Sequence, residues 1–348
     1  MFDPDAINSL ATEKLESTSK LFGRKWKVSI LEPISESDVE TEYTAHVVSD
    51  SDYEDTSLRV TFNIQKFWTM PNYSEVCVYN LAPDLENMIV KRGWRVIVQA
   101  GYVNGAFGTI YHAPIFQPLW EREDTVTSKL TLRCIDAMDV IYQNHVATVG
   151  TVMQHQKDMV AKMMSEARVP SKITQMSDTL EDNVLPRPKI YFDAPIYYMR
   201  KYAQQSGTLP SVSGLNTYIM KPTDVPTQKL IDEAIPLFPG LGGLVGTPQQ
   251  TQNGISFTCL LNPNIDLFSP NPMLVKLDKA VVIKQLQLTQ GDEKFSILDK
   301  DGVYKVIGLT HIGDTRGQSW YTNVNGVDQS LSGTAGAMFQ TTRDTIQG

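Results

Sequence analysis

Residues 92–139 restrict the fold more than any other stretch of this sequence. Trp94, Val96 and Val98 alternate with the residues between them, which is the period-two pattern of a β-strand. Asn104 and Gly105 follow, and this pair favours the positive φ angles that a two-residue type I′ hairpin turn requires. The stretch therefore predicts a strand, a tight turn and a second strand.

The second strand of this hairpin is predicted to be long. It extends from residue 109 toward residue 120 and ends at the charged run 121–124, where we expect the chain to reverse. Residues 127–134 return as a third strand, with Leu130 and Leu132 on one face and polar residues on the other. Nothing in these three strands indicates catalysis.

Several short strands precede the hairpin. Period-two alternation predicts them at residues 26–31, 43–48, 58–64 and 76–79. Pro83 then opens a single helical turn that runs through Met88. Together with the hairpin, these strands predict a closed or nearly closed antiparallel barrel that ends at about residue 142.

The apolar pattern becomes helical after residue 145. Apolar residues recur at intervals of three and four from Val149 to Ala167, which predicts an amphipathic helix that Pro170 stops. Its methionines can form a partner groove or a core-facing stripe, and the stripe is favoured because methionine fills irregular gaps. Residues 171–189 are predicted as loop. A strand at 190–192, a helix at 195–202 and a helix opened by Pro226 complete a small α/β domain.

Glycines cluster in residues 235–248 and invite comparison with a phosphate-binding loop. The stretch lacks the Gly-Lys-Ser/Thr sequence and leads toward a strand, whereas a phosphate loop opens a helix. We therefore favour the interpretation of residues 235–248 as a hinge, or as a loop whose glycines let another part of the backbone approach closely. Asn253 and Gly254 predict a hairpin turn into a strand over residues 255–261.

The last part of the chain repeats the order of the first hairpin. A strand at 295–298, a turn at Asp301-Gly302, a longer strand at 303–312, a polar reversal at 313–318 and a returning strand at 319–324 follow one another. An internal duplication of a barrel is favoured over coincidence between two unrelated barrels. At the chain ends, the sequence predicts a helix over residues 5–22 and, beyond residue 328, a tail that is flexible or ordered by a partner.

Composition excludes several classes of protein. The net charge of -8 argues against a protein that grips nucleic acid, whose surface would be basic. Cys77, Cys134 and Cys259 have no paired spacing, so we interpret them as small buried apolar residues of a chain made in a reducing cytoplasm. The start of the sequence has no signal-peptide pattern, and no apolar run is long enough to span a membrane. A soluble protein is expected.

Candidate catalytic and metal-binding residues are few. The five histidines show no ligand spacing, and the interpretation as surface or hydrogen-bonded structural residues is favoured for His46, His112, His145, His155 and His311. Asp136 and Asp139 could form an acid/base pair, but turn or helix-cap roles are favoured for aspartates after a strand. No nucleophile motif is present. The sequence therefore predicts a protein that is not an enzyme, with no catalytic, cofactor-binding or metal-binding residue.

Short phrases in the two halves resemble one known family. The phrases are NLAP at residues 80–83, QAGY at 99–102, the L-x-C-I-D pattern at 132–136, GTPQ at 246–249 and LNP at 261–263. They are similar to phrases in the baseplate hub protein of contractile-tailed bacteriophages, over roughly residues 58–327. This resemblance implies a homotrimer in which each chain supplies two tube-like barrels. Three chains would then offer six similar units to a sixfold tail tube and a threefold seat to a central spike.

The resulting fold class is α+β and β-rich, with two antiparallel tube-like β-barrel domains and a small α/β domain between them. The expected boundaries are 1–25 for an N-terminal arm, 26–145 for the first barrel, 146–235 for the α/β domain, 236–328 for the second barrel and 329–348 for the tail. The resemblance implies as partners a second and third copy, the tail tube protein or a tube-initiator ring, the spike, and tape measure and baseplate wedge proteins. It implies a place in the virion tail, after assembly in the host cytoplasm.

Two alternatives stay open beside the hub hypothesis. A tail-associated peptidoglycan hydrolase would need a pair of placed carboxylates or a metal site, and the sequence identifies neither. The hub of a phage-like contractile injection machine is not distinguishable from that of a true phage. From the acidic composition we also expect a net negative or neutral channel wall, along which DNA slides without sticking. We expect no sequence-specific binding of nucleic acid and no insertion of the protein into a membrane.

Overall fold

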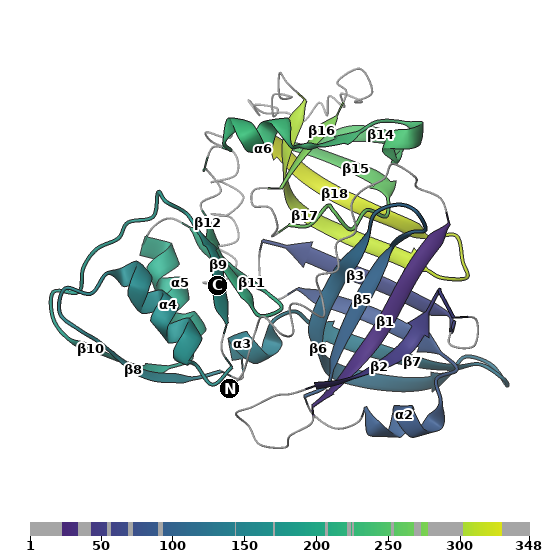
Figure 1. The fold of residues 1–348 in the computed structure, drawn as a ribbon, viewed down its shortest axis with the longest axis horizontal. Coiled ribbons are helices and arrows are strands. Elements are labelled where there is room, and N and C mark those ends of the chain that lie inside the picture. Colours follow the sequence, from purple (N-terminus) through teal and green to yellow (C-terminus); the bar gives the residue numbers. More distant parts are fainter. Residues whose placement is uncertain are drawn as a thin grey trace, which may run out of the picture.

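One large sheet dominates the computed structural model (Figure 1), and two small sheets accompany it. Its thirteen strands include an unbroken path in the order β14-β15-β18-β17-β3-β4-β7-β6-β5-β1-β2, while β13 and β16 pair beside β17. The structure describes residues 23–33, 43–53, 57–68, 72–89, 93–142, 144–169, 171–205, 208–220, 224, 226–251, 254–267, 273–277 and 302–328.

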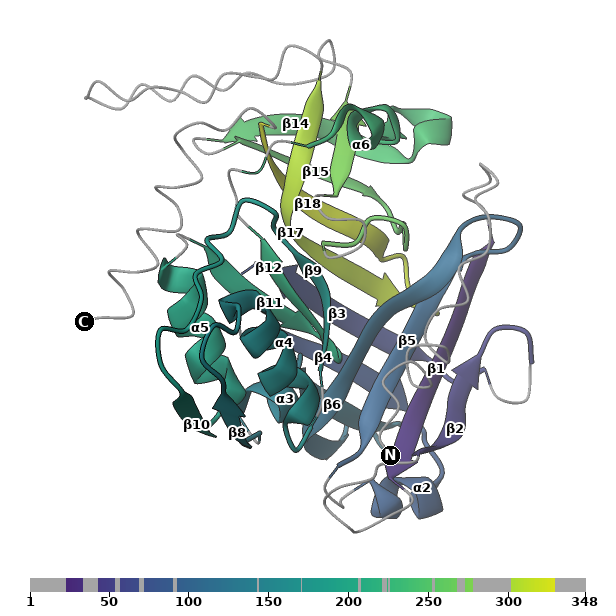
Figure 2. The same ribbon diagram turned by 60° about the vertical axis from the view of Figure 1, so that its left-hand side comes forward.

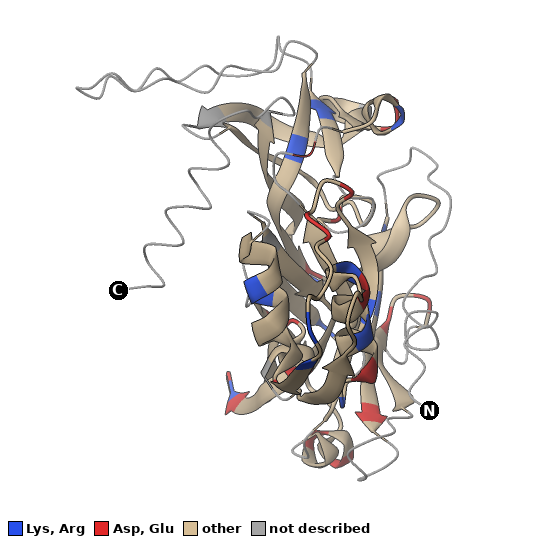
Figure 3. Ribbon diagram, turned by 90° about the vertical axis from the view of Figure 1, so that its left-hand side faces the viewer, with Lys and Arg blue, Asp and Glu red and all other residues tan. Residues whose placement is uncertain are grey.

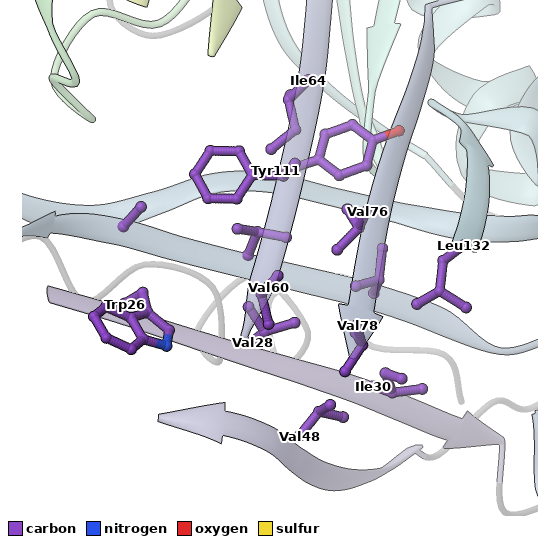
Figure 4. Close-up of a cluster of buried hydrophobic side chains, with 14 of the residues drawn as sticks. Trp26, Val28, Ile30, Val48, Val60, Ile64, Val76, Val78, Tyr111 and Leu132 are labelled. Carbon is purple, nitrogen blue, oxygen red and sulfur yellow. The ribbon is translucent and has the colours of Figure 1, made fainter. Parts of the chain in front are cut away.

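The first seven strands form two layers that face each other. They are β1 (Arg24–Pro33), β2 (Tyr43–Asp50), β3 (Val60–Phe67), β4 (Tyr73–Tyr79), β5 (Arg95–Tyr102), β6 (Phe107–Arg122) and β7 (Ser128–Ile135), with the short helix α2 (Pro83–Met88) after β4. β6 links the layers, because its first half pairs with β5 and its second half with β7, with an irregularity between Ile115 and Gln117. Apolar side chains of the two layers meet in one core (Figure 4), which accounts for the predicted alternation.

The hairpin between β5 and β6 has a different turn from the predicted one. The Tyr102 amide donates to the Ala106 carbonyl at 3.1 Å, and Asn104 has a φ of 63°. The loop therefore contains three residues, and the predicted two-residue type I′ turn is wrong. Gly101 has its own reason to be glycine, because a Cβ there would lie 2.0 Å from the Ala106 carbonyl oxygen.

The middle of the chain forms an α/β unit with its own core (Figure 2). Its elements are α3 (Met138–Tyr142), β8 (Val146–Gly150), α4 (Gln156–Glu166), β9 (Lys172–Met176), β10 (Lys189–Asp193), α5 (Pro195–Gln205), β11 (Leu209–Ser213) and β12 (Asn216–Met220). Met159, Met163 and Met164 are buried in this core, so the interpretation of the methionine stripe as core is confirmed.

Two predictions for this unit are wrong. The helix begins at Gln156 rather than at Val149, because residues 146–150 pair with β10 as a strand. Residues 171–189 are not all loop, since β9 lies there and pairs in parallel with β12. The errors have different causes: Val149 of β8 matches a helical spacing with later apolar residues by chance, whereas the polar strand β9 is stabilised by a distant partner and carries little local pattern.

The remaining elements return to the large sheet. They are α6 (Gln228–Asp232), β13 (Ile235–Leu237), the 3₁₀ turn η2 (Gly240–Gly242), β14 (Leu244–Thr251), β15 (Gly254–Leu260), β16 (Leu274–Leu277), β17 (Val303–Asp314) and β18 (Trp320–Asp328). The predicted hairpin into β15 is confirmed, but Gly254 pairs with Thr251 and belongs to the strand, and Asn253 lies outside the described residues. Gly254 has a φ of 155°, and a Cβ there would lie 2.0 Å from the Gly326 carbonyl oxygen, so another residue would strain this hairpin.

The ladder between β17 and β3 joins two sets of strands, the first set being β1–β7 and the last set β13–β18. It runs from the pair Gly308 and Phe67 to the pair Asp314 and Thr61. Within the described residues the sheet has open ends at β14 and β2 and does not close on itself. The β-rich α+β class is confirmed, whereas the two barrels, their duplication and the domain boundaries stay predictions. The predicted helix 5–22, the strand 295–298 and the tail after 328 lie outside the described residues.

An arginine cluster fastens the turn after β17 to the first strands. Arg59 makes two hydrogen bonds to the Asp314 carboxylate, at 2.8 and 3.3 Å. Arg24 donates to the carbonyls of Asp314 at 2.9 Å and Gln318 at 3.0 Å, and its guanidinium lies 5.5 Å from the Trp320 ring centre. The hydrogen bond from Arg59 holds the pKa of Asp314 at about 2.

No described helix is long and apolar enough to cross a membrane.

We expect Asp314→Asn to lower the free energy of unfolding by roughly 1–2 kcal/mol at neutral pH, a value reduced for the solvent screening of the 43% exposed Arg59. The depressed pKa means that the ionised carboxylate stabilises the fold above its unfolded value of 3.8, and that this contribution disappears as the pH falls toward about 2. Urea denaturation of both proteins should therefore show a difference that shrinks across this range. Asp52→Asn, at the exposed pair with Lys25, is the control; an equal loss in both variants would contradict the assignment.

Candidate functional site

Many polar side chains lie on the side of the large sheet that points away from its cores, beside a few apolar ones such as Leu260 and Ile312. We call this surface the uncharged face and define it by Thr61, Asn63, Gln65, Ser256, Thr258, Thr310, Asn323 and Asn325. The strand registers place Thr258, Asn323, Thr310 and Gln65 in one row across β15, β18, β17 and β3. Because side chains alternate along a strand, their neighbours Phe257, Val324, Leu309 and Ile64 point into the cores.

The same surface continues across β4, β7 and β6, where its charged residues are paired. Asn63 lies opposite Glu75, and Glu75 lies opposite Arg133, which donates to it at 3.3 Å. The next pair joins Lys129 and Glu121 at 2.6 Å. Each pair sums to zero charge, so these contacts keep the surface close to neutral.

Tyr73 supports the first of these pairs at the end of β4. Its hydroxyl donates to the Glu75 carboxylate at 2.6 Å, and burial together with this bond raises the pKa of Tyr73 to about 12. The phenol is therefore neutral at physiological pH and adds no charge to the surface.

A buried polar seam lies beneath the uncharged face, where the two hydrophobic cores meet. Lys66 pairs with Asp266 at 2.9 Å, and His311 Nδ1 lies 2.9 Å from the Thr322 hydroxyl. Burial opposes ionisation of Asp266, but the ion pair outweighs it and lowers the pKa. Burial and the nearby Lys66 cation lower the pKa of His311 to about 3, so the imidazole is neutral. The first contact fixes β3 to the loop before β16, and the second fixes β17 to β18.

Asp136 and Asp139 both take part in structural contacts. Asp139 forms an ion pair with the buried Arg95 and accepts the Val140 amide at 3.0 Å, at the start of α3. Asp136 is 2% exposed and accepts the amide of Gly214 at 2.8 Å, which holds the β11–β12 hairpin against the end of β7. Burial raises the pKa of Asp136. The main contacts of both aspartates are with residues distant in the sequence, so the predicted turn and helix-cap roles stay predictions.

The histidines lie apart from one another. His112 accepts a hydrogen bond from Arg95 at 3.0 Å, and burial beside this cation lowers its pKa well below the usual value. His46 lies 2.9 Å from Glu32, and His155 lies 3.0 Å from Asp182. In the described part of the chain, no three histidine, cysteine, aspartate or glutamate side chains form a group suited to a metal ion. Cys134 and Cys259 are buried free thiols, as predicted, whereas Cys77 is a free thiol that is only half-buried.

The sequence analysis did not identify the uncharged face. Its local signal was present, because threonine, asparagine, glutamine and serine alternate with apolar residues in 61–65, 256–258 and 323–325. What could not be seen was that these strands adjoin, since β3 and β17 are separated by more than two hundred residues. The buried pair of Lys66 and Asp266 was missed for the same reason.

No protein-family model matches this sequence, and no curated protein matches it. Among solved structures, the 43 kDa tail protein of prophage MuSo2 from Shewanella oneidensis has a TM-score of 0.51 and 8% identity, over 88% of this chain and 99% of that one. A tail protein from Neisseria meningitidis has a TM-score of 0.49 and 11% identity, over 88% and 97%. A type VI secretion component from Escherichia coli has 0.49 and 11%, over 78% and 73%.

The match to the Shewanella protein extends over nearly its whole length. At 8% identity it establishes a shared fold and nothing about activity. The chain therefore has the fold of a phage tail protein, and the resemblance inferred from the sequence phrases is confirmed at that level.

Proposed function

We propose that this chain is a structural protein of a contractile phage tail, namely a baseplate hub that forms a homotrimeric ring around the DNA channel. The observation that carries the proposal is the fold shared with a prophage tail protein along 88% of the chain. The sheet that joins the first and last strands supports it, because one chain then presents two sets of strands on one continuous surface.

A ring of this kind would adapt one symmetry to another. A sixfold tube can dock on a threefold object only where that object presents six similar surfaces. Three chains with two similar strand sets each would supply them, while the other end of the trimer would keep a threefold seat for a central spike. The tail tube protein or a tube-initiator ring and the spike are the proposed partners, with tape measure and wedge proteins beside them.

The uncharged face is the proposed channel wall. DNA is attracted mainly by cations near its phosphates, and each such contact strengthens binding at low salt. A wall of neutral amides and hydroxyls, with its carboxylates paired to cations, offers hydrogen bonds but no net attraction. Such a wall would let DNA pass without being held.

Lysines placed on this face should convert it into a surface that retains DNA. Asn63 and Asn325 are exposed on β3 and β18, so Asn63→Lys with Asn325→Lys keeps the cores intact. We expect the assembled variant to bind duplex DNA at least about tenfold more tightly than the unchanged protein at low salt, with the gain lost as salt rises. Electrophoretic mobility shifts of the assembled rings would measure it.

The control carries the same charge elsewhere. Ser165→Lys with Gln204→Lys adds two lysines at exposed positions of α4 and α5, away from the large sheet. If the control retains DNA as strongly as the variant of the uncharged face, that face has no special relation to the channel.

Native mass spectrometry combined with a zymogram tests the proposal as a whole. A hub predicts a trimer without lytic activity, and a reconstruction of the tail tip should place three copies around the axis. A monomer that clears peptidoglycan would instead support the alternative of a tail-associated hydrolase. The hub of a phage-like contractile injection machine would give the same mass and would be recognised from the particle that contains it.

A further inference from the structure

The outermost strand of the α/β unit has an edge that no other described strand covers. Among the described strands, β10 pairs with β8 alone. Along an antiparallel strand the residues alternate. The backbone N–H and C=O groups of one residue bond to the neighbouring strand, and those of the next residue point away from it. The Phe192 amide donates to the Tyr198 hydroxyl at 3.3 Å, so Phe192, and Ile190 two residues before it, direct their backbone groups away from β8.

The two side chains at this edge are apolar and exposed. Ile190 is 74% exposed and Phe192 is 78% exposed, and both lie on the sheet face opposite to the helices. Val149 of β8, which pairs with Ile190, adds a third exposed apolar side chain at 49%. Single exposed apolar residues are common, but several side by side on a strand edge mark a surface that binds another protein.

The helix-facing side of the same strand borders a pocket. Lys189 and Tyr191 line it together with Tyr198 and Lys201 of α5, and Met159 forms part of its wall. Its volume is about 80 Å³, enough for one side chain. A strand added at the edge of β10 would therefore find an apolar surface for one set of its alternating side chains and a pocket for the other.

The local charge identifies the chemistry of the occupant. Lys189 and Lys201 line the pocket, Arg187 and Arg200 are close to them in sequence, and Asp193 is the only acidic residue between 187 and 201. Figure 3 views the α/β unit and shows both blue lysine or arginine bands and red aspartate or glutamate bands on it. A chain with a net charge of -8 thus carries a local excess of positive charge here, beside lysines whose ammonium groups border the pocket.

We propose that the edge of β10 binds an extended, acidic segment of another protein by adding it as a third strand to the β10–β8 sheet. Its backbone pairs with Ile190 and Phe192, and the Phe192 amide exchanges the Tyr198 hydroxyl for a carbonyl of the added strand. Its apolar side chains cover these two residues, and its carboxylates meet Lys189 and Lys201. This site is separate from the uncharged face. It does not depend on whether that face lines a channel.

The test uses a fluorescent decapeptide that alternates valine with glutamate as a probe of this chemistry. Anisotropy with the full chain should show saturable binding below about 1 mM. The same peptide with lysine in place of glutamate should bind at least tenfold more weakly. Two N-methylated peptides, blocked at odd or at even positions, should differ, because only one set of amides faces β10. Absence of binding, equal affinity of the lysine peptide, or equal behaviour of the N-methylated pair would overturn the proposal.

Variants locate the site. Ile190→Glu with Phe192→Glu removes the apolar surface and adds like charge, and we expect at least a tenfold weaker affinity with an unchanged circular dichroism spectrum, since both residues are exposed. Val126→Glu, at an 85% exposed residue of the β6–β7 turn, is the matched control and should bind normally. If the double variant binds as well as the control, the edge is not the site. If the double variant instead changes the native mass, the surface is a contact between copies of this chain and the proposal fails. If the native mass is unchanged, the result has no bearing on the hub proposal, so the two can fail separately.

Discussion

Trp320→Ala is expected to lower the free energy of unfolding by about 3–5 kcal/mol, the range for removing a large buried aromatic ring. Trp320 opens β18 in the last set of strands, but its ring lies in the core of the first set and is 2% exposed. It makes edge contacts with Phe62, at 5.5 Å between ring centres, and with Trp26, at 6.5 Å. Its indole nitrogen also donates to the Gly101 carbonyl at 3.3 Å. One side chain of the last set of strands thus packs into the core of the first set and couples the two.

Urea denaturation followed by fluorescence and by circular dichroism would measure the loss. We expect a single transition in the unchanged protein, because the β3–β17 ladder and Trp320 make the two strand sets one cooperative unit. Trp320→Phe keeps most of the apolar area and should cost markedly less than the alanine change. Trp120→Ala is the control, since that ring is 42% exposed on β6. A loss of less than about 1 kcal/mol for Trp320→Ala would contradict its role as a link between the sets.

Local alternation predicted most strands of the large sheet. Residues 26–31 and 58–64 carry a period of two, because alternate side chains of each strand point into the core. Residues 303–312 were predicted from their place after the Asp301-Gly302 turn. The strands β9, β11 and β12 escaped notice because their partners and the helices above them, not a local pattern, make them strands. The helix predicted from residue 149 was too long, since Val149 and Val152 matched the spacing by chance.

The candidate site was less accessible from sequence than the fold. Alternation shows which residues share the face of one strand, but not which strands lie side by side. Thr310 and Gln65 are neighbours only because β17 pairs with β3, which no local rule predicts. The charges of the wider surface could be counted in advance, yet their neutrality depends on the pairing of Glu75 with Arg133 across β4 and β7.

The buried histidines should make the protein lose stability steeply in mild acid. His311 is 1% exposed, and burial beside Lys66, against the weaker opposing effect of Asp266, lowers its pKa to about 3. Above pH 6.5 the imidazole is neutral in both states and contributes nothing to the pH dependence. As the pH falls below its unfolded value of 6.5, the unfolded chain binds a proton that the folded chain does not. Each such proton lowers the free energy of unfolding by about 1.4 kcal/mol per pH unit.

His112 acts in the same direction, because burial and the adjacent Arg95 also lower its pKa. We therefore expect His311→Gln to remove about half of the slope of unfolding free energy against pH between 6.5 and 5, a window above the ordinary titration of carboxylates. His112→Gln should remove a similar part, and the double variant most of it. Urea midpoints at several pH values would give these slopes. A flat profile for the unchanged protein, or equal slopes in all four proteins, would contradict this prediction, because both imidazoles would then become protonated inside the fold. The contact of His112 with Arg95 and the position of His311 beside the Lys66–Asp266 pair oppose such protonation.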